Sequence, residues 1–195
     1  MLLGNLFKSG VKNYKNIPIK GISFDSRKVK RDHIFFAING NKTSGIKFIK
    51  EAITKGAVAV VTNKNIKSKN YKIPLVLVKD VRKSLAEASS NFYKKKPRNI
   101  VAVTGTNGKS SVAGFFYQIL SLNNKSVSSI GTLGIISKNY NKKINLTSPD
   151  SLFLHKNLEI LAKKKINNVI LEASSNGLQQ KRLNHLNIKT GIFKN

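Results

Sequence analysis

Short apolar runs and helically spaced apolar residues alternate along the first half of the chain. Apolar, β-prone runs bounded by turn residues predict four strands, at Lys20–Phe24, Ile34–Ile38, Val58–Val61 and Leu75–Val78. Apolar residues at helical spacing predict one helix that starts near Phe48 and ends at Gly56, and a second helix over 81–92. The pattern therefore predicts a small α/β unit in this half of the chain.

The second half of the chain has the pattern of a parallel sheet. Strands are expected at Asn99–Val103, at Ser126–Ile130, near Leu133–Ile136, at Asn168–Leu171 and just before Asn195. Helices are expected over 112–122 and 149–164. Strands that alternate with helices favour parallel pairing through crossover helices, and ligand sites then lie at the carboxyl ends of the strands.

A basic run and a proline separate the two halves. The segment Tyr93–Arg98 precedes a strand and is typical of a linker. We therefore predict an N-terminal domain over 1–96 and a second domain over 97–195. The last strand has no helix after it, so we expect the second domain to be incomplete.

Composition narrows the class of protein. Of 195 residues, 40% are hydrophobic, enough for a real core, and the absence of cysteine excludes disulfides, zinc–thiolate sites and cysteine nucleophiles. No apolar run approaches the roughly 18–20 residues of a membrane span, and the N-terminus lacks the features of a signal peptide. We expect a cytoplasmic, monomeric protein with no membrane partner.

The net charge of +28, from 36 basic and 8 acidic residues, allows two interpretations. The positive electrostatic field of such a charge attracts nucleic acid. However, arginine is scarce, the lysines are scattered, and their short clusters lack the interleaved aromatic residues that stack on bases. We favour compositional drift from AT-rich codons and expect no nucleic-acid partner, although part of the charge can attract an anionic substrate.

A glycine loop lies between a predicted strand and a predicted helix and is typical of a phosphate site. The loop runs through Gly105, Thr106, Asn107, Gly108, Lys109, Ser110 and Ser111. Glycines let several backbone N–H groups face one anion, and the helix adds its positive N-terminal end. In such a loop Lys109 neutralises the β- and γ-phosphates, and the Ser110 hydroxyl binds Mg²⁺.

Three further groups of polar residues follow or precede predicted elements. Asp25-Ser26-Arg27 follows one strand, and a Gly40-Asn41-Lys42-Thr43 turn follows the next; they could cradle a sugar or a diphosphate, or be ordinary loops. Thr147 or Ser148 can cap the helix that follows, with Pro149 in its first turn. Glu172 ends a buried-looking strand, where a carboxylate can hold a nucleotide's Mg²⁺. His155 is expected to be solvated.

Together, and in this order, these motifs resemble the Mur ligases of peptidoglycan synthesis. The family's phosphate loop, Thr-Gly-Thr-Asn-Gly-Lys-Thr-Thr, is matched at Thr104–Ser111 with two changes that keep a hydroxyl. The family's Asp-Ser-Arg, its Thr-Thr-Pro and its Glu-Val-Ser-Ser-His-Gly-Leu are matched at Asp25–Arg27, Thr147–Pro149 and Glu172–Leu178. Two residues depart from the pattern: Ser44 replaces an Asp, and Asn176 replaces the His.

The closest likeness is to the members that add the third amino acid, meso-diaminopimelate or L-lysine, to UDP-N-acetylmuramoyl-L-alanyl-D-glutamate through an acyl phosphate. The resemblance implies a UDP-sugar-binding domain followed by part of an ATP-binding domain, with ATP on the glycine loop, Lys109 as catalytic residue, and Mg²⁺ on Ser110 and Glu172. It also implies substrate contacts from Phe24, Ser26, Asn41, Lys42, Thr43, Thr147, Ser148, Ser174, Gln180 and Arg182.

The family continues for several hundred residues beyond the motif matched by Phe193-Lys194-Asn195. We therefore expect this chain alone to be inactive as a ligase, and the choice of amino acid stays open. The alternatives are another P-loop NTPase, a dipeptide-adding or folylpolyglutamate-like ligase, and a basic nucleic-acid-binding module.

Overall fold

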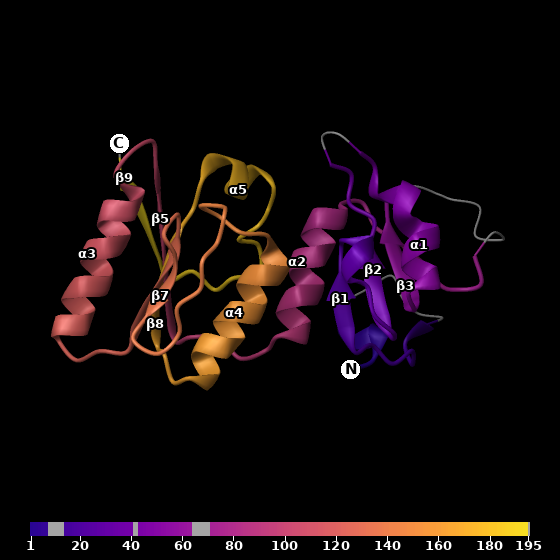
Figure 1. Cartoon of the computed structure of the whole chain (residues 1–195), viewed down its shortest axis with the longest axis horizontal. Coiled ribbons are helices and arrows are strands. Elements are labelled where there is room, and N and C mark those ends of the chain that lie inside the picture. Colours follow the sequence, from indigo (N-terminus) through magenta and orange to yellow (C-terminus); the bar gives the residue numbers. More distant parts are fainter. Residues whose placement is uncertain (8–13, 41–42, 64–70, 195) are drawn as a thin grey trace. The chain divides into compact units, whose positions relative to one another are not determined.

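The computed structural model describes residues 1–7, 14–40, 43–63 and 71–194, so Asn41 and Lys42 lie outside the described residues. The chain divides into two compact units, Met1–Phe92 (unit 1) and Tyr93–Asn195 (unit 2). Each unit is an α/β structure built on its own sheet (Figure 1). Across the described ranges, none of the helices combines the length and apolar character needed to cross a membrane.

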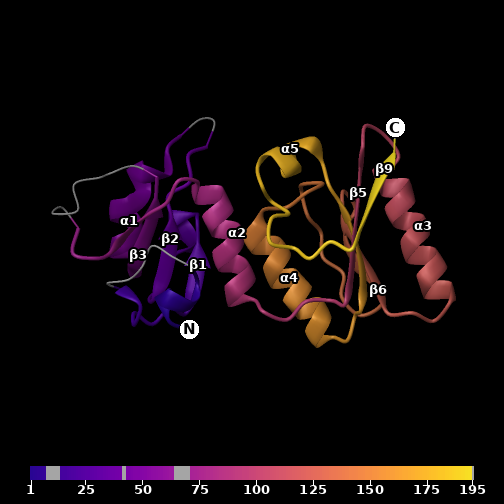
Figure 2. The same ribbon diagram turned by 180° about the vertical axis from the view of Figure 1, so that it is seen from behind.

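Unit 1 is built on a parallel sheet of four strands in sequence order. The strands are β1 (Gly21–Ser23), β2 (His33–Phe36), β3 (Ala57–Thr62) and β4 (Leu75–Leu77). Helices α1 (Ile49–Thr54) and α2 (Val81–Phe92) lie on opposite faces of this sheet (Figures 1 and 2). The 3-10 helices are η1 (Leu3–Asn5), η3 (Ser26–Lys28) and η4 (Gly45–Phe48). The helix expected from Phe48 to Gly56 corresponds to α1, and η4 directly precedes it.

Unit 2 is built on a five-stranded sheet with the order β7-β6-β8-β5-β9. Its strands are β5 (Asn99–Gly105), β6 (Val127–Gly131), β7 (Gly134–Ser137), β8 (Asn168–Glu172) and β9 (Thr190–Lys194). Its helices are α3 (Lys109–Leu122), α4 (Ser151–Lys163) and α5 (Ser175–Gln179). Four strands are parallel, as the alternating pattern predicts, whereas β7 pairs antiparallel with β6 because only two residues separate them.

Helices α3 and α4 lie on opposite faces of this sheet (Figures 1 and 2). Alternate residues of β8 serve the two faces, as expected for a strand whose side chains alternate. Val169 and Leu171 join the larger core with Leu158 of α4, whereas Ile170 packs with Ala113 of α3. The strands β6 and β8 are therefore buried on both sides, whereas the edge strand β9 is largely exposed. Glu172, at the end of β8, is held by this packed core.

Three expectations for unit 2 are wrong in detail. Helix α3 begins at Lys109, not at Val112, because helical backbone needs no apolar residue in its first turn. Helix α4 is capped by Asp150, whose side chain accepts a hydrogen bond from the Phe153 N–H, and not by Thr147 or Ser148. His155 is fully buried rather than solvated, because it lies on the face of α4 that packs into the unit.

Candidate functional site

The glycine loop of unit 2 joins β5 to α3 and depends on its two glycines. Gly105 has φ +141°, and a Cβ there would lie 1.7 Å from the carbonyl oxygen of Lys194 in β9. Gly108, the N-cap of α3, has φ +78°. Only glycine adopts these conformations readily, and no side chain covers the first N–H groups of α3 from the N-cap position. The loop therefore has the backbone of an anion site at the start of a 14-residue helix.

Lys109 lies over this loop. Its Nζ donates hydrogen bonds to the carbonyl oxygens of Gly105, at 2.6 Å, and Thr106, at 3.0 Å. The side chains of Thr106 and Asn107 are exposed. The ammonium group is thus held beside the backbone that would surround a phosphate chain.

Glu172, at the end of β8, is the centre of a hydrogen-bonded cluster and is only 4% exposed. Its Oε2 accepts hydrogen bonds from the hydroxyls of Ser110, at 3.0 Å, and Thr132, at 2.9 Å. Its Oε1 accepts one from the Thr132 backbone N–H, at 3.2 Å. A Cβ at position 131 would lie 2.1 Å from this Oε1, so Gly131 makes the space that the carboxylate occupies.

The donor set fits magnesium. Ser110 and Glu172 offer only oxygen, and Mg²⁺ uses one or two protein oxygens together with phosphates and waters rather than a full protein cage. No group of three or more His, Cys, Asp or Glu side chains gathers in the described part of the chain. The structure thus brings together the two residues that the sequence predicts as magnesium ligands; the binding itself stays a prediction.

A second set of predicted site residues surrounds the Glu172 backbone. The buried Ser148 hydroxyl donates to the Glu172 carbonyl oxygen and accepts from the Ser174 N–H, both at 2.8 Å. Arg182 donates through Nε and NH2 to Oε1 of Gln180, at 3.1 and 2.7 Å, and through NH1 to the Ser148 carbonyl oxygen. The structure therefore holds these four residues in one connected group, in which the Ser148 hydroxyl links two loops.

Thr147 lies beside this group, and Ser174 also starts a short helix. The Thr147 hydroxyl lies 3.0 Å from the Thr132 hydroxyl, next to the Glu172 cluster. Ser174 is the N-cap of α5, and its Oγ accepts from the Gly177 N–H at 3.1 Å. The helix α5, only five residues long, is too short to give a periodic pattern and was not expected.

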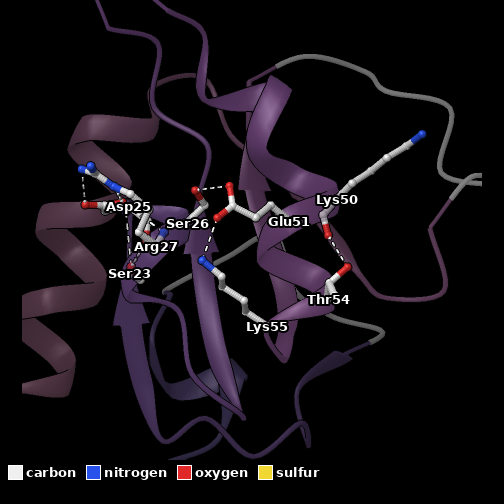
Figure 3. A network of polar contacts seen from close by, with 8 residues as sticks. All are labelled: Ser23, Asp25, Ser26, Arg27, Lys50, Glu51, Thr54 and Lys55. Carbon is white, nitrogen blue, oxygen red and sulfur yellow. Dashed lines mark hydrogen bonds and ion pairs between the residues drawn. The ribbon is translucent and has the colours of Figure 1, made fainter.

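In unit 1 the residues after β1 form a separate polar network (Figure 3). Asp25 caps η3 and binds the Arg27 guanidinium, with 2.9 Å between Oδ1 and Nε, and this hydrogen bond holds the pKa of Asp25 below its usual value. The buried Ser26 hydroxyl donates to Oε2 of Glu51 at 2.7 Å, and Oε1 of Glu51 pairs with Lys55 at 2.7 Å. Lys55 and Ser26 together lower the pKa of Glu51.

The other residues predicted for unit 1 lie at the same ends of the strands. Phe24, after β1, is 37% exposed. The Gly40 N–H donates to the carbonyl oxygen of Thr43 at 2.9 Å, which closes the turn after β2. That Phe24, Ser26 and Thr43 contact one ligand stays a prediction.

The sequence pattern did not indicate Thr132 or Glu51. The sequence shows only that Gly131-Thr132-Leu133-Gly134 separates two strands; that β6 is the parallel neighbour of β8 is seen in the folded sheet. That topology brings the residue after β6 next to Glu172 at the end of β8. Glu51 carried no such signal, because one acidic residue on an exposed helical turn is ordinary.

Two models of one protein family match the chain. Residues 18–93 match the model described as Mur ligase family, catalytic domain, and residues 103–195 match the Mur ligase middle domain. The chain belongs to the Mur ligase family. The α/β architecture and the family resemblance expected from the motifs are confirmed.

The chain is similar in sequence to Mur ligases that carry one enzyme name. The UDP-N-acetylmuramoyl-L-alanyl-D-glutamate–2,6-diaminopimelate ligase of Rickettsia montanensis is 44% identical over 185 residues, which is 92% of this chain and 38% of that protein. The enzyme of the same name from Mesorhizobium japonicum is 39% identical over 180 residues, 92% of this chain and 37% of that protein. The chain thus spans less than two fifths of the length of these relatives.

Solved structures of Mur ligases have the same fold. A structure of a UDP-N-acetylmuramoyl-L-alanyl-D-glutamate–2,6-diaminopimelate ligase superposes with a TM-score of 0.85 at 28% identity, over 99% of this chain and 40% of that one. The MurF ligase of Thermotoga maritima gives a TM-score of 0.52 at 24% identity, over 82% of this chain and 32% of that one. The second likeness concerns the fold alone.

Proposed function

We propose that this chain carries the ATP site and the UDP-muramoyl-dipeptide site of a ligase that adds 2,6-diaminopimelate to UDP-N-acetylmuramoyl-L-alanyl-D-glutamate in peptidoglycan synthesis. The observation that carries the proposal is the contact between Ser110, at the start of α3, and Glu172, at the end of β8, beside the glycine loop. The names and identities of the relatives support the choice of diaminopimelate.

In the proposed reaction, a carboxylate oxygen of the dipeptide attacks the γ-phosphorus of ATP. The bond to the β-phosphate oxygen breaks, and ADP and an acyl phosphate result. The amine of diaminopimelate then attacks the acyl carbon, inorganic phosphate leaves, and the amine loses a proton as the amide forms. Acyl phosphate formation converts a poor leaving group into a good one, which is why ATP is consumed.

Unit 2 supplies the groups that stabilise the transferred phosphoryl group. The backbone N–H groups at the start of α3 would hold the phosphates, and Lys109 would exchange its contacts with Gly105 and Thr106 for the β- and γ-phosphate oxygens. Mg²⁺, held by Ser110 and Glu172, would neutralise developing charge on those oxygens. Thr147, Ser174, Gln180 and Arg182 would face the muramoyl-peptide end of the substrate.

Unit 1 would bind the UDP end through Phe24, Ser26 and the turn that includes Asn41, Lys42 and Thr43. The Ser26 proton is donated to Glu51, so the Ser26 oxygen keeps lone pairs for a donor on the ligand. Arg27 donates through Nε and NH2 to the Asp25 carboxylate, which stabilises the loop after β1.

The test of this proposal is binding of a non-hydrolysable ATP analogue with Mg²⁺, measured by titration calorimetry. Lys109→Met should weaken binding about 10- to 100-fold, because it removes charge-assisted hydrogen bonds to phosphate. Lys156→Met, at an exposed position of α4, is the matched control and should bind as the unaltered chain does. Equal affinities for the two variants, or no binding by the unaltered chain, would reject the nucleotide site.

A further inference from the structure

Thr132 donates two hydrogen bonds to the Glu172 carboxylate, whereas the predicted site residue Ser110 donates one. It lies in the two-residue turn between β6 and β7, whereas Glu172 ends the neighbouring strand β8. The Thr132 hydroxyl donates to Oε2 at 2.9 Å, and its backbone N–H donates to Oε1 at 3.2 Å. One residue thus binds both oxygens of the carboxylate, which fixes the rotation of the carboxylate plane.

The turn is built for this contact. Gly131 leaves the space for Oε1, since a Cβ there would lie 2.1 Å from it. Gly134 has φ +102°, and a Cβ there would lie 2.4 Å from the carbonyl oxygen of Lys142. Glycine is therefore required at position 131 to make room for the carboxylate, and at position 134 for the turn to pass the Lys142 backbone.

The proton positions in this cluster follow from counting donors. A carboxylate only accepts hydrogen bonds, so Ser110 and Thr132 each use their one hydroxyl proton on Glu172. The Thr132 oxygen then accepts in its contact with the Thr147 hydroxyl at 3.0 Å, and Thr147 is the donor. The hydroxyls of Thr147 and Thr132 form a chain toward Glu172, and Ser110 keeps its lone pairs for a cation.

We propose that Thr132 is a positioning residue that orients the Glu172 carboxylate for the magnesium ion of the bound nucleotide, and that it links this metal site to Thr147 on the side of the muramoyl peptide. This role rests on the proposed function. Thr132 itself does not bind the metal. Partners that orient metal ligands in this way typically account for 10- to 100-fold in metal affinity.

The experiment compares Thr132→Val with Thr132→Ser in the whole 195-residue chain. Valine removes the hydroxyl and keeps the shape and the backbone N–H, whereas serine keeps the hydroxyl. The probe is Mn²⁺, whose binding in the presence of a non-hydrolysable ATP analogue is followed by water-proton relaxation. Binding of the same analogue in EDTA is measured by calorimetry and reports on the loop without the metal.

Thr132→Val should weaken Mn²⁺ binding about 10- to 100-fold. Thr132→Ser should stay within about threefold of the unaltered chain, and affinity in EDTA should change by less than about twofold in both variants. Unchanged Mn²⁺ affinity in Thr132→Val overturns the positioning role of Thr132. An equal loss of Mn²⁺ affinity and of nucleotide affinity in EDTA also overturns it, because Thr132 would then support only the structure of the turn. If valine lowers the melting temperature, Thr132→Ala carries the same comparison. An unaltered chain that binds no nucleotide rejects the proposed function, a result distinct from either of these.

Discussion

His155 is a buried histidine whose protonation is coupled to the folding of unit 2. Its Nε2 lies 3.2 Å from the carbonyl oxygen of Asn184, which identifies Nε2 as the protonated nitrogen of the neutral ring, and the buried Nδ1 has no partner in the described structure. Burial, and to a lesser extent the positive charge of Lys96, lowers the pKa of His155 to about 3. The ring therefore stays neutral in the folded chain across the whole neutral and mildly acidic range.

This gives a prediction for stability against pH. In the unfolded chain the histidine pKa is about 6.5, so below that pH the unfolded state binds a proton that the folded state does not. Lowering the pH from 7 to 5 should cost about 2 kcal/mol of unfolding free energy through His155. Burial also lowers the pKa of His33, which therefore costs stability in the same pH window. The contribution of His155 is the difference between the unaltered chain and His155→Gln in denaturant titrations at pH 7, 6 and 5.

The variant that tests this prediction is His155→Gln, which keeps a donor for the Asn184 carbonyl oxygen. His155→Gln should reduce the pH dependence of the unfolding free energy between pH 7 and 5, and the part that remains includes the contribution of His33. Parallel slopes for His155→Gln and the unaltered chain would mean that His155 does not remain neutral in the folded state.

At the scale of elements, the junction of β5 and α3 depends on backbone conformation more than on side chains. Gly105→Ala places a Cβ against the Lys194 carbonyl oxygen at a φ that alanine rarely adopts, so both the strand end and β9 must shift. We expect the variant to lose more than about 1 kcal/mol of stability and to lose nucleotide affinity. Thermal melting and calorimetry measure the two effects.

Gly114 in α3 is the matched control for this prediction. A Cβ at this position meets no atom within 4 Å, and its backbone is helical. Gly114→Ala should therefore stabilise the chain by about 0.5–1 kcal/mol, because alanine loses less backbone entropy in a helix than glycine. A destabilised Gly114→Ala, or a Gly105→Ala variant as stable as the unaltered chain, would contradict the conclusion that backbone conformation limits Gly105 and not Gly114.

The elements were predictable where a long periodic pattern existed, and their ends were not. Helix α2 was expected over the residues that form it, because Leu85 and Ala88 repeat on one buried face. The start of α3 was missed because Lys109, Ser110 and Ser111 carry no apolar signal, although backbone hydrogen bonding already includes them. The cap of α4 was misassigned because Asp150, Ser148 and Thr147 are all good caps, and tertiary contacts decide among them.

Site residues, like elements, were predictable only where the sequence itself carries a signal. The contact between Ser110 and Glu172 could be anticipated from the sequence. Ser110 belongs to the glycine-loop motif after β5, Glu172 is a charged residue at the end of β8, and these two strands are parallel neighbours. Thr132 has neither a motif nor a charge, and its importance depends on which strand lies beside β8, which is a property of the folded sheet. The burial of His155 likewise depends on which face of α4 meets the sheet.

At the scale of the whole molecule, the two units carry different parts of the proposed function. Ser26 and its Glu51–Lys55 network belong to unit 1, and the loop with Lys109 belongs to unit 2. Each unit has its own sheet and its own buried cores. Mutations in one unit should therefore change the affinity for one ligand and leave the other unaffected.

UDP and the ATP analogue with Mg²⁺ are the probes for this separation, each titrated into the same variants by calorimetry. Ser26→Ala should weaken UDP binding about 2- to 10-fold, the effect of one hydrogen bond, and leave the affinity for the ATP analogue unchanged. Lys109→Met should do the reverse. Thr54→Ala, which removes an exposed hydroxyl of unit 1 that donates to the Lys50 carbonyl oxygen, should alter neither affinity. A residue that binds only UDP should affect only the affinity for UDP. If Ser26→Ala lowers both affinities equally, or leaves UDP binding unchanged, unit 1 does not bind the UDP end through Ser26.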